Sequence, residues 1–298
     1  WYRSRGLGDV YKRQDPERDA LRMANHTRVF HTRPSREVVQ EAVTKQFHSG
    51  EGAIQFAPEA IARSNADLLT TPELRQEFQE IYCEQGRHEA GRWLQLNHPE
   101  MTEAELEHRL GRYGLNPCGE ILGADFHCNL AEVHLNRLDP DDLEGQSDAF
   151  RAAGLSVACL LNHRFEVERY RQSRAWDPIV GVSFTGLFDF FVHAFGTPWL
   201  EWWAAGRPET AEGLTFKEKE AAYLSRWKTT VNEAVWDYCD RHGIRRPNRC
   251  TTVQPAGTKS LLTGAAPGWH PPKAQRFIRR ITFRKNDPVA LACLDYGY

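Results

Sequence analysis

Short apolar runs set between long helical patterns constrain the fold of this chain more than any other feature. Residues 178–182 are apolar and β-branched and predict a buried strand, and the strongly apolar and aromatic residues 185–195 predict a buried helix after it. Long helical patterns flank this pair at residues 139–174 and 214–241. Strands that alternate with helices indicate an α/β fold with parallel pairing of the strands.

The same periodicities predict further elements along the chain. Helices are expected at residues 35–48 and 72–95, after a capping box at 102–105, and briefly at 258–262; strands are expected at 53–57, 126–135, 250–253 and 277–284, with a turn at 114–119. No internal repeat or low-complexity segment interrupts this pattern.

Composition excludes several classes of protein. The 298 residues are 41% hydrophobic and 26% charged, with a formal net charge of -2, which argues against a dedicated nucleic-acid or membrane-surface protein. No apolar run approaches the roughly 18 residues of a membrane span, and no signal peptide is recognisable. Seven cysteines without regular spacing do not predict a disulfide framework. Reduced thiols and a cytoplasmic location are therefore expected.

The two ends of the sequence have unusual features. Residues 1–14 are basic and interrupted by glycine, they resemble translated sequencing-adaptor reads, and they are expected to be non-native. Residues 291–298 end without a capping or tail signal. We therefore expect an internal fragment in which residues 15–298 form part of a domain truncated at both ends; a processed whole domain is the alternative.

A thiol and a carboxylate lie two residues apart in the sequence Asn-Pro-Cys-Gly-Glu at residues 116–120. The proline and glycine favour a rigid turn that presents Cys118 in a defined direction, close to Glu120 and ten residues ahead of Cys128. This arrangement suits chemistry on a substrate, although a buried cysteine beside a surface glutamate is the structural alternative. A metal site is disfavoured because zinc ligands usually include closer cysteine pairs. Its ligands would be Cys118, His127, Cys128 and His134.

A second candidate is the sequence Gln-Pro-Ala-Gly-Thr-Lys-Ser at residues 254–260. A predicted strand leads into it, small residues expose backbone N–H groups, and Thr258 and Ser260 add hydroxyl donors, which is a pattern that suits phosphate. It is not a Walker A loop, because Thr252 stands where the first glycine is expected. A purely structural junction is the alternative.

Together these segments resemble the large catalytic subunit of ribonucleotide reductases. Asn-Pro-Cys-Gly-Glu-Ile at 116–121, followed by Phe-His-Cys-Asn-Leu at 126–130, is similar to the adenosylcobalamin-dependent class II enzymes and especially to the monomeric triphosphate reductases. Three further stretches agree in order, so that the resemblance extends over roughly residues 15–298: 50–60, 181–187, and 254–260 with 267–271.

The resemblance implies a partial ten-stranded α/β barrel with a central finger loop over residues 15–298. Cys118 would carry the thiyl radical and Glu120 would be the general base at the ribose 3′-hydroxyl. Asn116 would orient the ribose hydroxyls, and Cys128 would be one of two cysteines that reduce the intermediate. The residues expected to hold substrate phosphates are Pro255, Ala256, Gly257, Thr258, Lys259 and Ser260.

The resemblance also implies the cofactor and the partners. These are adenosylcobalamin, a ribonucleotide substrate, deoxynucleotide effectors and a thioredoxin-like reductant, in deoxyribonucleotide synthesis for DNA, with no metal site and no nucleic-acid or membrane partner. Diphosphate and triphosphate substrates remain open. The partner of Cys128 and a C-terminal cysteine pair are expected outside this sequence, so the chain alone is expected to be inactive. The thiols with no family role are read as structural: Cys83, Cys159, Cys239, Cys250 and Cys293.

Three other assignments compete with this one. A class I subunit, which takes its radical from an iron-containing partner, usually has leucine at the position of Gly119 and lacks the preceding proline, so class II is favoured. Glycyl-radical reductases fit less well, because an acid at the position of Glu120 is not expected in them. A catalytically dead nucleotide-binding module is disfavoured by the joint presence of the four candidate catalytic residues.

Overall fold

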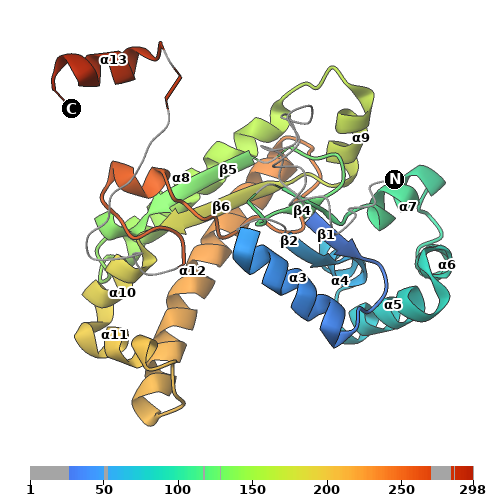
Figure 1. Ribbon diagram of the computed structural model, residues 1–298. Helices are drawn as coiled ribbons and strands as arrows, with labels where there is room; N and C mark the ends of the chain where they lie inside the picture. The colour runs from blue at the N-terminus through green and yellow to red at the C-terminus, as the bar shows by residue number, and fades with distance from the viewer. Residues whose placement is uncertain are drawn as a thin grey trace.

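The computed structural model describes residues 27–49, 53–116, 118–127, 129–269, 283–284 and 286–297. Helices and short strands alternate along this part of the chain, and buried side chains form two separate hydrophobic cores. Figure 1 shows the larger core region at the centre, around strands β5 and β6, with the helices of the N-terminal third on one side. The predicted mixture of helices and strands is confirmed.

A parallel pair of strands forms the centre of the molecule. Strand β5 (Asn129–His134) pairs with β6 (Val180–Thr185), and α8 (Leu143–Cys159) and α9 (Glu168–Trp176) connect them. The predicted parallel pairing is therefore correct for this sheet. The strand expected at 250–253 is reduced to one parallel bridge, between Val182 and Thr251.

The two faces of this sheet differ in chemistry because successive side chains of a strand point to opposite sides. The apolar face carries Ala131, Val133, Val182 and Phe184, and the polar face carries Leu130, Glu132, His134, Gly181, Ser183 and Thr185. Helix α8 and the long helix α12 (Ala211–Arg241) cover the apolar face. These two helices do not cover the polar face.

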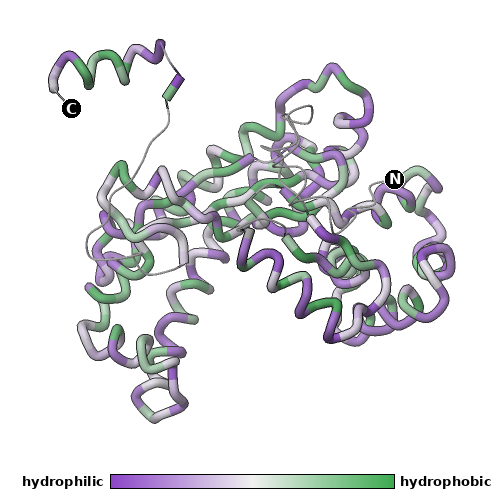
Figure 2. Tube along the Cα trace, in the orientation of Figure 1, coloured by the Kyte–Doolittle hydropathy of each residue, from purple (hydrophilic) through white to green (hydrophobic). Residues whose placement is uncertain are grey.

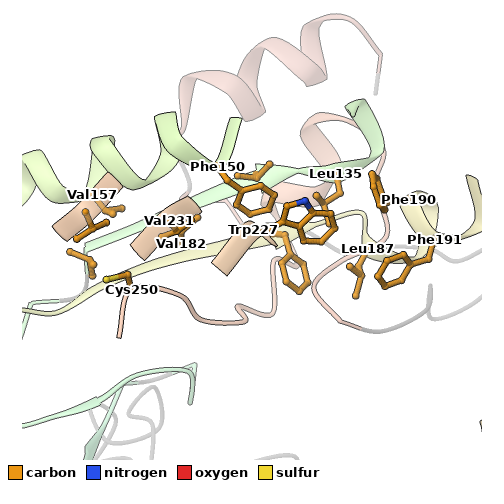
Figure 3. Close-up of a cluster of buried hydrophobic side chains, with 14 of the residues drawn as sticks. Leu135, Phe150, Val157, Val182, Leu187, Phe190, Phe191, Trp227, Val231 and Cys250 are labelled. Atoms are coloured by element: carbon orange, nitrogen blue, oxygen red, sulfur yellow. The ribbon is translucent and has the colours of Figure 1, made fainter. Parts of the chain in front are cut away.

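Aromatic side chains fill the core between the sheet and these helices (Figure 3). Trp227 of α12 stacks on Phe150 of α8 with ring centroids 5.1 Å apart, and its indole N–H donates to Gln146 at 3.0 Å. The helices approach closely at Gly154, where an added Cβ would lie 3.2 Å from the Cβ of Ala234. This packing buries the apolar face of β6, and the residues of its polar face are buried as well.

A predicted buried helix follows β6 at once, as α10 (Leu187–Phe195), beginning after Gly186, which has φ of +76°. A second short helix, α11 (Thr197–Ala204), had not been predicted. Pro198 in its first turn favours the start of a helix there. The indole N–H of Trp199 donates to the buried carboxylate of Glu220, which ties α11 to α12.

The N-terminal part contains a second parallel pair and the second core. Strand β1 (Thr27–Phe30), which the sequence did not predict, pairs with β2 (Ala53–Phe56), and α3 (Arg36–Ser49) lies between them in sequence. The core is formed mainly by the four helices after β2: α4 (Ala57–Ser64), α5 (Pro72–Gln85), α6 (Arg87–Asn97) and α7 (Glu103–Leu110).

The single helix expected at 72–95 is wrong, because Gly86 separates two helices. Gly86 has φ of +92°, which a right-handed helix cannot accommodate, and its N–H closes α5 by donating to the carbonyl of Tyr82. The predicted helix start after Thr102 is confirmed: the Thr102 side chain accepts a hydrogen bond from the backbone N–H of Glu105 at 3.2 Å.

Buried charges connect the two cores. Arg109 of α7 binds Asp67 and Glu105, at 2.9 and 2.8 Å. Arg112, whose side chain is 0% exposed, has its Nε 3.3 Å from a carboxylate oxygen of Asp177, just ahead of β6. Burial raises the pKa of Asp177 to about 6, against the opposing effect of Arg112, and burial lowers the pKa of Arg112 to about 10.

The last helix described is α13 (Pro288–Asp295), at the end of the chain (Figure 1). The strand expected at 277–284 lies mostly outside the described residues, and Phe283 and Arg284 are not in a strand. Apolar segments concentrate in the central strands, while the peripheral helices carry much polar sequence (Figure 2). Among the described helices, none has the length and apolar character needed to cross a membrane.

Candidate functional site

The Asn-Pro-Cys-Gly-Glu segment forms the loop of a small antiparallel hairpin, between β3 (Gly114–Leu115) and β4 (Leu122–Gly123). The side-chain oxygen of Asn116 accepts hydrogen bonds from the backbone N–H groups of Glu120 and Ile121, both at 3.0 Å. Gly119 turns the loop with φ of +80°, and its N–H donates to the Asn116 carbonyl at 2.9 Å. Asn116 therefore shapes the loop; Pro117 lies outside the described residues.

The hairpin presents its two reactive groups in different surroundings. Cys118 is an exposed free thiol near the tip of the loop. Glu120 is half-buried, and its Oε2 is buried without a hydrogen-bond partner among the described residues. The backbone carbonyl of Glu120 accepts a hydrogen bond of 2.7 Å from the hydroxyl of Thr252. This bond fastens the hairpin to the segment that leads into the 254–260 loop.

A cavity of about 200 Å³ opens beside Glu120. Its walls are residues 119–122 with Leu115, residues 177–180 at the start of β6, and four residues ahead of the second loop: Asn248, Arg249, Thr251 and Thr252. Cys118 does not line it. The volume suits one small polar group more than a whole nucleotide, for which pockets of roughly 300 Å³ or more are usual. No sequence pattern indicated that Asp177 and Arg249 would share a cavity with Glu120.

A glycine allows the hairpin to pack on the polar face of the central sheet. A Cβ added at Gly181 would come 2.8 Å from methyl groups of both Leu130 and Thr252, and 3.5 Å from the side chain of Ile121. Ile121 belongs to the hairpin and Thr252 to the segment after the bridge. Both therefore lie over this face at Gly181.

The predicted phosphate loop at 254–260 lies on the same face. The N–H of Gln254 donates to the hydroxyl of Ser183, which is fully buried on the polar face, at 2.8 Å. Ala256 has φ of +53°, a left-handed conformation that costs about 1–2 kcal/mol outside glycine. Ser260 closes the turn by donating from its N–H to the Ala256 carbonyl at 3.1 Å. The short helix expected here is one 3₁₀ turn, η4 (Lys259–Leu262).

The chain continues across the polar face beyond η4. The His134 ring nitrogen Nδ1 lies 2.7 Å from the hydroxyl of Thr263, and the Thr185 hydroxyl donates to the Ala266 carbonyl at 3.1 Å. The two candidate segments, predicted separately from the sequence, are thus brought to one face of one sheet. Cys128 lies outside the described residues, as does His270.

Gly268 is expected to be required where the chain passes close to the start of the 254–260 loop. It has φ of +51°, and an added Cβ would lie 2.6 Å from the Gln254 carbonyl oxygen and 3.1 Å from that of Pro255. Gly264 has a similar φ of +68° but nothing within 4 Å of such a Cβ. We expect Gly268→Ala to lower the free energy of unfolding by about 1–3 kcal/mol more than Gly264→Ala, measured by urea denaturation. Equal losses would show that only backbone strain matters.

Two of the thiols without a family role are unsuited to redox chemistry. Cys250 is buried in the central core (Figure 3), and burial raises its pKa to about 12. Burial likewise raises the pKa of Cys239 to about 11. Because the thiolate is the reactive form, both are inert at neutral pH. Cys118 and Cys159 are exposed.

Comparison with known proteins finds several relatives that share one name. The adenosylcobalamin-dependent ribonucleoside-triphosphate reductase of Lactobacillus gasseri is 30% identical over 196 residues, covering 62% of this chain and 25% of the relative. The proteins of that name from Levilactobacillus brevis and Lacticaseibacillus paracasei are each 29% identical, covering 62% and 67% of this chain and 25% and 29% of the relatives. The chain thus spans about a quarter of the length of the curated relatives it matches.

A solved structure described as a B12-dependent (class II) ribonucleotide reductase matches 54% of this chain and 23% of its own, at 22% identity and a TM-score of 0.43. No family model matches the chain. The resemblance inferred from the motifs is confirmed by the sequence relatives.

Proposed function

We propose that this chain is part of the catalytic domain of an adenosylcobalamin-dependent reductase that converts ribonucleotides to 2′-deoxyribonucleotides. One observation carries the proposal: the hairpin bearing Cys118 and Glu120 and the loop at 254–260 pack on the same polar face of a parallel sheet, joined through Thr252. A thiol, a carboxylate and a phosphate-binding loop on one face suit a nucleotide that must meet all three. The names of the sequence relatives support the same activity.

Glu120 is proposed to be the general base. A buried carboxylate oxygen without a partner can accept the proton of a ribose 3′-hydroxyl, and the adjoining cavity has room for a small polar group. Asn116 would act chiefly by holding Glu120 in place, because its side-chain oxygen already binds the backbone of the loop. That role differs from the direct contact with ribose hydroxyls implied by the family resemblance.

Cys118 is proposed to carry the radical. When bound, adenosylcobalamin supplies the one-electron chemistry that removes the hydrogen atom from a thiol. The thiol of Cys118 is exposed at the tip of the hairpin, where a bound cofactor could reach it. The Cys118 thiyl would abstract the ribose 3′ hydrogen, Glu120 would take the 3′-hydroxyl proton, and the 2′-hydroxyl would leave as water with a proton from the cysteine pair. Cys128 and a second thiol would supply two electrons and two protons in all, one proton to the departing water and one to C2′, and would form a disulfide. Cys118 would then return the hydrogen atom to C3′, and Glu120 the proton to the 3′ oxygen.

The remaining family features are proposed in the same way. The strands β5 and β6 and the bridging residue Thr251 would be neighbours in a ten-stranded barrel whose interior is the polar face, with residues 15–298 forming part of that barrel. A ribonucleotide substrate, deoxynucleotide effectors and a thioredoxin-like reductant would be the partners.

A turnover assay tests the proposal. The protein encoded by the complete gene, incubated with ribonucleoside triphosphates, adenosylcobalamin and a dithiol, is expected to form deoxyribonucleotides only when the cofactor is present. The 298-residue chain alone is expected to form none, since a partner thiol for Cys128 is not assigned within it. Reduction that instead needs an iron-containing subunit would favour class I, and nucleotide binding without any reduction would favour a dead module.

A further inference from the structure

Glu132 of β5 is buried with little to satisfy its charge. Its side chain is 3% exposed, and neither carboxylate oxygen accepts a hydrogen bond from the described residues. Its counter-charge is Lys259, whose ammonium nitrogen lies 3.1 Å from Oε2. A carboxylate this deeply buried depends strongly on such a partner, because an unpaired charge in a protein interior is very costly.

Lys259 is bound from a second side as well. Its ammonium group also donates to the side-chain oxygen of Gln254, which is 5% exposed. Gln254 is itself anchored through its backbone N–H to Ser183, and Ser183 is paired with Glu132 across the two strands. The Lys259 ammonium therefore lies between Glu132 and Gln254, while the lysine side chain as a whole is 47% exposed.

These contacts span the most constrained part of the loop. Gln254 and Lys259 bracket Ala256, which is held in a left-handed conformation. Strained backbone persists only where surrounding contacts enforce it. The bracket from Glu132 through Lys259 to Gln254 is such a contact, since it ties the two ends of the turn to each other and one of them to β5.

We propose that Glu132 is a positioning residue for the 254–260 loop, and that Lys259 is the tether through which it acts and not itself a ligand of phosphate. The inference rests on the proposed function, in which this loop holds the phosphates of a nucleotide. It reassigns Lys259, which sequence reasoning had placed among the phosphate ligands. The ammonium group is paired with Glu132, so the backbone and hydroxyl groups of the loop would bind the phosphates.

The two possible roles of Lys259 predict opposite changes in the affinity of the Glu132→Gln chain for inorganic tripolyphosphate. Binding to the 298-residue chain can be measured by calorimetry. If Lys259 is a tether, Glu132→Gln and Lys259→Met each release the loop, and each weakens binding by about tenfold. If Lys259 is a phosphate ligand, Glu132→Gln frees its charge and binding becomes tighter, which would overturn the proposal. The exposed pair Lys217–Glu209, at 3.0 Å, provides the control: Lys217→Met is expected to change nothing.

A thermal-unfolding cycle without ligand tests the tether independently of the function. Lys259→Met leaves Glu132 buried and unpaired and is expected to lower Tm by about 5 °C or more, whereas adding Glu132→Gln to it should recover most of that loss. Additive effects of the two changes would overturn the tether. If Lys259→Met does not fold, Glu132→Gln, which preserves shape, still carries the binding test. A wild-type chain that binds no tripolyphosphate would refute the phosphate site of the proposed function, while the cycle would still decide on the tether.

Discussion

Replacing Cys118 by serine is expected to reduce ribonucleotide reduction by at least about 10³-fold, to background, in the protein encoded by the complete gene. The hydroxyl of serine holds its hydrogen atom too strongly to be converted into a radical that abstracts hydrogen from ribose. Nucleotide binding should stay within about twofold of the wild type, because Cys118 is exposed near the tip of the hairpin and does not line the cavity. Turnover and equilibrium binding should be measured on the same preparation.

Cys159 provides the matched control for this change. It is another exposed free cysteine, at the last residue of α8, the helix that covers the apolar face of the sheet and not the face on which the hairpin packs. Cys159→Ser should leave both turnover and binding unchanged. Reduction that survives in Cys118→Ser would refute the assignment of the radical site, and loss of reduction in Cys159→Ser would show that the assay reports general thiol damage.

The largest effect on stability is expected at Arg112. Its side chain is 0% exposed and lies between the two cores, with its Nε 3.3 Å from Asp177. Arg112→Met leaves that carboxylate buried without its closest cation, and we expect the free energy of unfolding to fall by about 3–5 kcal/mol. Arg87 and Glu107 form an exposed pair at 2.7 Å, so that Arg87→Met should cost only about 0–1 kcal/mol in the same urea titration.

The loss of unfolding free energy in Arg112→Met should depend on pH. Burial raises the pKa of Asp177 from its ordinary value of 3.8 to about 6, and Arg112 opposes this rise. Without Arg112 the folded-state pKa rises further, so stability continues to fall with increasing pH beyond the point at which the wild type has levelled off. The deficit of Arg112→Met should therefore be smaller at pH 5 than at pH 8. A deficit independent of pH would mean that lost packing, and not the charge of Asp177, dominates.

Local sequence patterns predicted the central elements of the fold because their causes are local. The β-branched run at 178–182 and the aromatic helix after it became β6 and α10. The break at Gly86 was missed because the helical periodicity continues on both sides of it, and only the positive φ reveals the end of α5. Strand β1 was missed because four residues without a clear alternation carry little signal.

The candidate site was predictable as two segments and not as an arrangement. The residue types at 116–120 and 254–260 indicated a thiol, an acid and a phosphate loop. The contact between Glu132 and Lys259 depends on strand register and on the path of a distant loop, which no local pattern encodes. The same holds for the cavity shared by Glu120 and Asp177.

The separation of the two cores has a consequence for how the chain acquires its structure during synthesis. The second core is made chiefly by helices that follow one another between Ala57 and Leu110, so its contacts are short in sequence and can form as soon as that stretch leaves the ribosome. The first core cannot close until α12 has been made, because α12 covers the sheet begun by β5. Until then, α8 alone covers the apolar face of β5 and β6, and the side chains that pack against α12 are open to other chains. The helical unit is therefore expected to fold before the central sheet, and Arg112 has no contact with Asp177 until the sheet has formed.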